Sequence, residues 1–193
     1  MSVPATRARR WSRVEYERLI AHGLFQPGER LELIGGELLV REPQGDPHAL
    51  AMELVGDALR GALGPGWRVR VQLPVALADD SEPEPDFSIV RGVPRRITGR
   101  SIPSRPALIV EVADSSVGFD RRQKGSLYAR AGVADYWIVN LGKRVLEVRR
   151  QPEVSIAAPY GWHYREVRML DPAATVSPIA VPGARIRVAD LLP

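Results

Sequence analysis

The chain has 193 residues, 45% of them hydrophobic, which suffices for one well-packed core. Its net charge of +4 favours an anionic partner. The absence of cysteine excludes disulfides and thiolate metal sites, and the lack of a bilayer-length apolar run or a secretory signal predicts a soluble cytoplasmic protein without a membrane partner.

The N-terminal segment divides into an arm and the start of a domain. Residues 1–11 are rich in arginine and are expected to form a disordered basic arm, whereas residues 12–193 form a single domain. Ser12 is followed three residues later by Glu15, which is a capping-box pattern. This pattern predicts a short helix that ends near Gly23.

A hairpin and a longer helix are expected next. Residues 30–34 and 37–41 alternate around two adjacent glycines, which is typical of a β-hairpin. Pro47 then begins a segment whose apolar residues recur at helical spacing as far as Leu63. This helix is expected to pack on a sheet.

Three segments with strand character follow. Residues 67–78 are interrupted by Pro74, which is typical of an edge strand or a bulge. Residues 86–90 and 107–113 are short and rich in β-branched side chains. Their order along the chain favours antiparallel pairing of these last two segments.

The rest of the chain predicts one helix and further strands. A helix is expected over residues 117–131. Residues 135–141 and 144–150 predict a hairpin about Gly142, and a later strand is expected at residues 162–169. Because a helix of this length can join parallel strands by a right-handed crossover, we predict an α/β (α+β) fold with a mixed central sheet flanked by helices.

Two carboxylates are expected to meet at one end of this sheet. Asp86 begins one strand and Glu111 lies towards the end of the next, so antiparallel pairing brings them together. Two oxygen donors beside water suit Mg²⁺, with Mn²⁺ as a substitute. The plainer alternatives are that Asp86 only ends a turn and that Glu111 pairs with an arginine.

The helix after these strands carries an unusual lysine. Lys124 is one of two lysines in a chain with 25 arginines, and a desolvated lysine, unlike arginine, can lose its proton. Asp120, Lys124 and Tyr128 share one helix face, from which the ammonium group could assist an attacking water. Alternatively, the lysine faces solvent, the aspartate favours the helix N-terminus and the tyrosine fills the core.

A basic loop lies between the two carboxylates. It has no acidic residue, and its arginines could bind phosphates; they include Arg91, Arg95, Arg96 and Arg100. His48 could add a further phosphate contact. On composition alone, the loop is a solvated linker and the histidine is a surface residue.

These parts meet the requirements of metal-assisted phosphodiester hydrolysis, and their sequence context resembles a known family. The motifs are PDF at 85–87, LIVEVADSS at 108–116 and D-x-x-x-K-x-x-x-Y-A-x-x-G-V-x-D-Y-W-I-V at 120–139. With LELIGGELL and PHAL upstream, they resemble the Uma family of restriction-endonuclease-like proteins, a branch of the PD-(D/E)XK nuclease superfamily. The resemblance covers residues 12–150 and implies a restriction-endonuclease-like core.

The resemblance also implies roles for the matching residues. Asp86 and Glu111 take the positions of the superfamily's metal ligands, and Glu37 in the GGE hairpin could be a third acidic contributor. The plainer alternative is that Glu37 is a solvated hairpin residue. The superfamily's usual lysine falls at Ala113 in this chain, so Lys124 from the next helix is its natural substitute.

We therefore predict a Mg²⁺-dependent endonuclease that hydrolyses phosphodiester bonds of DNA. A homodimer is expected, because the two-fold symmetry of duplex DNA favours a protein with the same symmetry. Two alternatives stay open. One is a catalytically inactive nucleic-acid or protein interaction module on the same fold, which Ala113 favours, and the other is a nuclease that acts on RNA.

Overall fold

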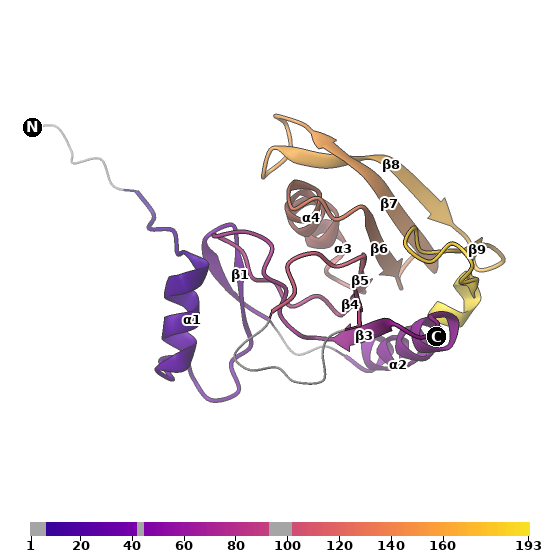
Figure 1. Cartoon of the computed structure of the whole chain (residues 1–193), viewed down its shortest axis with the longest axis horizontal. Coiled ribbons are helices and arrows are strands. Elements are labelled where there is room, and N and C mark those ends of the chain that lie inside the picture. The colour runs from indigo at the N-terminus through magenta and orange to yellow at the C-terminus, as the bar shows by residue number, and fades with distance from the viewer. Residues whose placement is uncertain (1–6, 42–44, 93–101) are drawn as a thin grey trace, which may run out of the picture.

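A six-stranded mixed sheet forms the centre of the computed structural model, which describes residues 7–41, 45–92 and 102–193 (Figure 1). Its strands are β3 (Trp67–Val71), β4 (Phe87–Arg91), β5 (Leu108–Ala113), β6 (Asp135–Asn140), β7 (Val145–Val154) and β8 (Trp162–Leu170). They lie in this order across the sheet, and all neighbours are antiparallel except β5 and β6, which are parallel. The predicted fold class is confirmed.

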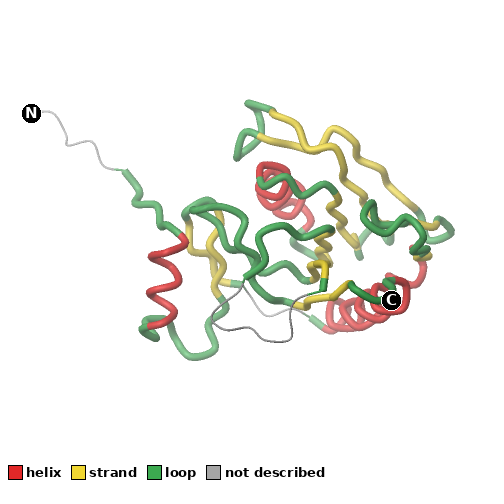
Figure 2. Tube along the Cα trace, in the orientation of Figure 1, coloured by secondary structure: helices red, strands yellow, loops and turns green. Residues whose placement is uncertain are grey.

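Helices and two small sheets surround this centre (Figure 2). The helical elements are α1 (Arg13–Ala21), α2 (Asp46–Ala62), α3 (Val117–Phe119), the π-helical turn η1 (Asp120–Lys124), α4 (Gly125–Arg130) and the 3₁₀ helix η2 (Val188–Leu191). The small sheets pair β1 (Leu31–Ile34) with β2 (Glu37–Val40), and β9 (Thr175–Val176) with β10 (Ile186–Arg187). Within the described ranges, every helix is too short or too polar to cross a bilayer.

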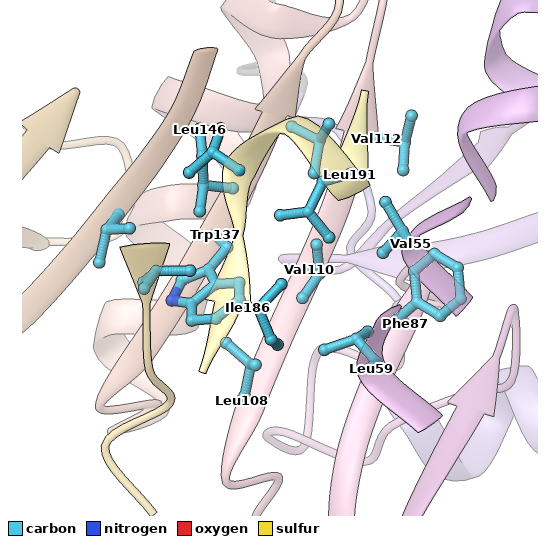
Figure 3. Packing of buried hydrophobic residues seen from close by; sticks show 14 of the residues in the cluster. Val55, Leu59, Phe87, Leu108, Val110, Val112, Trp137, Leu146, Ile186 and Leu191 are labelled. Atoms are coloured by element: carbon cyan, nitrogen blue, oxygen red, sulfur yellow. The ribbon is translucent and has the colours of Figure 1, made fainter. Parts of the chain in front are cut away.

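Each face of the sheet is covered by a hydrophobic layer. On one face, Val55 and Leu59 of α2 lie near Phe87 and Val110 of the sheet, and Leu191 of η2 joins them (Figure 3). Burying a side chain of this kind stabilises a fold by about 1.5 to 3 kcal/mol. The other face is covered by α4 and holds the second buried cluster. The two layers fix the crossover from β5 through α3, η1 and α4 to β6, which was predicted as a parallel connection.

The beginning of the chain differs in part from the predicted arm. The capping box of Ser12 and Glu15 is confirmed at the start of α1. Residues 7–11 have no regular secondary structure, but the Trp11 amide donates to the Gly36 carbonyl at 2.8 Å, so this stretch lies on the β1–β2 hairpin. Residues 1–6 of the predicted arm lie outside the described residues.

The strand predicted over residues 67–78 is shorter in the structure. It ends at Val71, because Gln72 adopts a positive φ of 47° that a continuing strand does not allow. Pro74 then lacks the amide that would extend the ladder of hydrogen bonds.

A buried carboxylate on β7 ties η1 to the sheet. Glu147 is fully buried, and its oxygens accept hydrogen bonds from Arg121 of η1 at distances between 2.6 and 3.1 Å. Asn140 and Arg149 donate to the same carboxylate at 2.9 and 3.0 Å. Burial alone would raise the pKa of Glu147, but these donors outweigh it and lower the pKa to about 2.

Glu147→Gln is expected to destabilise the fold by about 3 kcal/mol at neutral pH, because the ionised carboxylate is favoured in the folded state. The folded-state pKa lies below the ordinary value of 4.5, so this stabilisation is complete above pH 4.5 and is lost as the pH falls towards 2. Urea unfolding across this pH range measures the difference between wild type and variant. Glu53→Gln, at an exposed position of α2, is the control. A difference that does not shrink in acid would contradict the assignment.

Candidate active site

Asp86 and Glu111 lie side by side at one end of the central sheet. Phe87 of β4 pairs with Val110 of β5, so the next positions along the two strands are the two acids. The Val112 amide donates to Asp86 Oδ2 at 2.9 Å, and the Asp86 amide donates to Glu111 Oε2 at 3.3 Å. Both acids are buried. The predicted convergence of these two carboxylates is confirmed.

The crossover segment brings an ammonium group to the same place. Lys124 Nζ donates to Glu111 Oε1 at 2.9 Å, and the Tyr128 hydroxyl donates to the same oxygen at 2.6 Å. Asp120 lies in the same segment, where its Oδ2 accepts a hydrogen bond from the Ser116 hydroxyl at 2.6 Å. Asp120, Lys124 and Tyr128 are buried, so the lysine is not the solvent-facing residue of the plainer alternative.

The helix that carries these residues is not the uninterrupted α-helix predicted over residues 117–131. Its middle is the π-helical turn η1, in which the Gly125 amide reaches the Asp120 carbonyl five residues earlier. A Cβ at Gly125 would lie 3.2 Å from this carbonyl oxygen, which explains a glycine at this position. Such turns often occur at functional sites.

The β1–β2 hairpin supplies a second wall that the sequence did not reveal. Glu32 is buried, and its Oε1 lies 3.7 Å from Lys124 Nζ and accepts a hydrogen bond from the Glu84 amide at 2.8 Å. Arg41 follows the hairpin and donates from Nη2 to Asp86 Oδ1 at 2.9 Å. Neither residue was among the candidates. The available signal was the position of Glu32 between apolar residues of a strand, where a carboxylate needs a partner.

Glu37 does not join the site, so its proposed role there is a correction. It is exposed and forms an ion pair with Arg10 at 3.3 Å. In the hairpin, Glu37 pairs with Ile34 beside the turn, whereas Glu32 pairs with Leu39. The site acid therefore lies on the other strand, about 7 Å further from the turn.

His48 lies in the site rather than on the surface. It is buried in the first turns of α2, and its Nε2 is 3.3 Å from Asp86 Oδ2. Gln72 completes the surroundings of Asp86, with Nε2 at 3.4 Å from Oδ1. Both oxygens of this carboxylate are thus held by neighbouring donors.

Of the predicted arginine loop, the structure describes residues 91–92 and 102–106. Arg91 is exposed at the end of β4 and its guanidinium lies over the Trp67 ring, 5.0 Å from the centroid. Arg95, Arg96 and Arg100 lie outside the described residues. Their proposed contact with phosphates stays a prediction.

Together these elements enclose a pocket of about 430 Å³. The acids and the ammonium group line its floor, and Val40 and Phe119 add partly exposed apolar side chains to the lining. The pocket is therefore large enough for a small group such as a phosphate with its water, and most of its buried lining residues are charged or polar.

The model of the Uma2 family, described as putative restriction endonuclease, matches residues 13–189. The chain belongs to this family. The Uma2 fold found here is similar to the crystal structure of a putative nuclease belonging to DUF820 from Anabaena variabilis ATCC 29413, with a TM-score of 0.66. The two share 18% sequence identity, and the match covers 89% of this chain and 94% of that chain. No match was found among curated proteins.

The buried part of the Uma2 pocket carries more negative than positive charge. Its acids are Glu32, Asp86, Glu111 and Asp120, and its cations are Arg41 and Lys124. When all are ionised, these described groups leave two negative charges in excess. A site with more acids than cations attracts a further cation.

The excess of acidic groups also affects the pKa values of Lys124 and its partner Glu111. Burial alone would lower the pKa of Lys124, but the surrounding carboxylates, with Glu111 first, outweigh it and raise the pKa above its usual range. Lys124 therefore stays an ammonium group and acts as a donor, not as a base. Burial raises the pKa of Glu111 to about 8, and neighbouring Asp86 adds to this, although Lys124 opposes it.

Asp86 behaves in the opposite way. Burial alone would raise its pKa, but the hydrogen bond from His48 and the charges of Arg41 and Lys124 hold it well below its usual range. Asp86 is thus a permanent anion beside Glu111, whose charge is not fully balanced. The two acids of the pair have different protonation behaviour for this reason.

The residues present fit a hard divalent cation. Among the described residues, no group of three or more histidine and carboxylate side chains is arranged to hold a metal by itself. Mg²⁺ does not require such a cage, because it commonly binds through one or two carboxylates and keeps waters or substrate oxygens as its other ligands. Asp86 and Glu111 supply two such carboxylates, and the cation would replace the positive charge that the site lacks.

Proposed function

We propose that this Uma2 protein is a Mg²⁺-dependent endonuclease that hydrolyses phosphodiester bonds of DNA. Family membership and the nuclease-like fold support a nuclease in general. The observation that carries the finer proposal is the buried pair of Asp86 and Glu111, with Lys124 bonded to the second acid, in a pocket whose acids outnumber its cations. This is the donor set that phosphoryl chemistry with a hard cation requires.

Each residue has a role that follows from its contacts. Asp86 and Glu111 would hold Mg²⁺, or Mn²⁺ in its place. The bound ion would supply the Lewis acidity that stabilises charge on phosphate oxygens and activates water. Arg41 fixes the orientation of Asp86 through the bond from Nη2.

Lys124 assists the attacking water as a donor. Its ammonium group has three N–H bonds, of which one is directed to Glu111 and another faces Glu32 at 3.7 Å. The remaining N–H can hold a water or a phosphate oxygen in the pocket. Tyr128 limits the movement of Glu111 by donating to the same oxygen as the lysine.

One observation favours a second candidate, a module on this fold that binds nucleic acid or protein without cutting. Ala113 is fully buried where the superfamily's usual lysine falls, and every oxygen of Asp86 and Glu111 already accepts a hydrogen bond within the protein. Such a module would have no need of an ion.

The two candidates are separated by cleavage assays and titration calorimetry. Supercoiled plasmid, single-stranded DNA and RNA are incubated in parallel with Mg²⁺, with Mn²⁺ or with a chelator. We expect DNA to be cut only with the ions, and DNA affinity to fall steeply with added salt because arginine contacts release counterions. Absence of both cleavage and Mg²⁺ binding would favour the module, and preferential cutting of RNA would change the substrate.

A further inference from the structure

Strand β8 lies at one edge of the central sheet. Within the described ranges, β8 pairs with β7 on one side and with no strand on the other, and it forms the rim of the molecule (Figure 1). It has nine residues and no proline, and it keeps one register with β7, although the pair of Arg165 with Gln151 is missing from the ladder because Gln151 has a positive φ of 59°. Val167 and Met169 leave 46% and 49% of their surfaces exposed.

The opposite edge of the sheet is protected and β8 is not. At that edge, β3 has five residues and is ended by the positive φ of Gln72 and by Pro74. Short edges with such interruptions resist pairing, whereas a long regular edge is a template for another strand.

We infer that β8 pairs antiparallel with β8 of a second copy of this chain and joins two six-stranded sheets across a two-fold axis. An axis perpendicular to a sheet keeps each side chain on its own face. Because side chains alternate between faces, such an axis allows only registers in which one residue lies opposite its own copy. The identity of this central residue decides which side chains meet.

The charges of β8 disfavour three central residues and support Val167. An axis at Arg165, Glu166 or Arg168 would place two identical charges directly opposite each other, which destabilises a strand pair. An axis at Val167 places two valine side chains together. It also sets Glu166 opposite Arg168 of the second copy, and this pair occurs twice by symmetry.

The flanking residues agree with the Val167 register. Arg165 lies opposite Met169 of the second copy, and no two like charges meet directly in this register. Met169 becomes a diagonal neighbour of Val167 in the second copy. The two exposed apolar residues of each strand therefore form one continuous strip across the axis.

Single cysteines test the register directly, because the chain has no cysteine of its own. Residues that face each other across antiparallel strands have Cα atoms about 4.5 to 5.5 Å apart, a separation that a disulfide can span. Val167→Cys is expected to form a covalent dimer under mild oxidation. Met169→Cys is the matched control and should stay uncross-linked, since the two copies of that position are offset by about 13 Å along the strands.

Charge reversal tests the same arrangement without a cross-link. Glu166→Arg or Arg168→Glu alone is expected to weaken dimerisation about tenfold in light scattering or ultracentrifugation, because like charges then meet twice. The double variant restores opposite charges and should restore the dimer. A monomeric wild type, equal cross-linking of the two cysteine variants, or a double variant no better than the single ones would overturn the inference.

Discussion

Asp86→Asn is expected to lower the rate of DNA cleavage by about 100- to 1000-fold, because the amide keeps the shape of the side chain but loses the charge that holds the cation. Calorimetry should show a parallel loss of Mg²⁺ affinity. The substitution also leaves the partly buried Arg41 without the anion it contacts at 2.9 Å, so the fold is expected to lose stability. Activity must therefore be compared at a temperature where circular dichroism shows both proteins folded.

Asp114→Asn is the matched control for this experiment. Asp114 also lines the pocket, but its side chain is exposed and belongs to none of the buried pairs. Its replacement is expected to change cleavage less than about threefold, as for most exposed sites. Equal losses in the two variants would contradict a specific role of Asp86, and full activity of Asp86→Asn would remove it from the metal site.

Lys124→Met is expected to have the second large effect, on both stability and cleavage. It removes a buried ammonium group from between Glu111 and Glu32 and leaves their charges uncompensated, at a cost of about 3 to 5 kcal/mol in the free energy of unfolding. Cleavage is expected to fall at least about 100-fold, because the group that directs the water is lost. Chemical denaturation and single-turnover assays measure the two effects.

The chain offers a control of the same residue type. Lys143 is its other lysine and is exposed in the turn between β6 and β7, so Lys143→Met should leave stability and cleavage nearly unchanged. Lys124→Arg keeps the charge but enlarges the buried group, and should regain part of the stability without the activity. Wild-type turnover by Lys124→Arg would exclude a dedicated role of the ammonium group in directing water.

Much of the fold could be predicted because its elements are long enough to show a period. The hairpin at β1 and β2, helix α2 and the strands of the central sheet occur near their expected positions. Strands β9 and β10 have two residues each and show no period, so only their contacts with the core define them. The turn η1 could not be predicted, because the spacing of Asp120, Lys124 and Tyr128 along the sequence fits an uninterrupted α-helix equally well.

The part of the candidate site that depends on neighbouring strands could be predicted from the sequence. The part that depends on distant segments could not. Asp86 and Glu111 follow from one antiparallel pairing, and Lys124 from the helix next to it. Glu32 reaches the site because the hairpin docks on the segment before β4, through a bridge between Leu33 and Glu82. No local sequence pattern predicts such a contact. Whether these residues catalyse stays a prediction.

The π-helical turn makes the position of the ammonium group depend on chain length as well as on side chains. Such a turn accommodates one more residue than an α-helical turn. Deleting Gln123 from η1 would allow a regular helix and would rotate the preceding residues by about 100° relative to α4. Arg121 would then leave Glu147, and the Asp120 carbonyl would leave the Tyr136 hydroxyl that donates to it at 3.0 Å. Variation by insertion or deletion is therefore far more restricted in this segment than substitution of its exposed side chains.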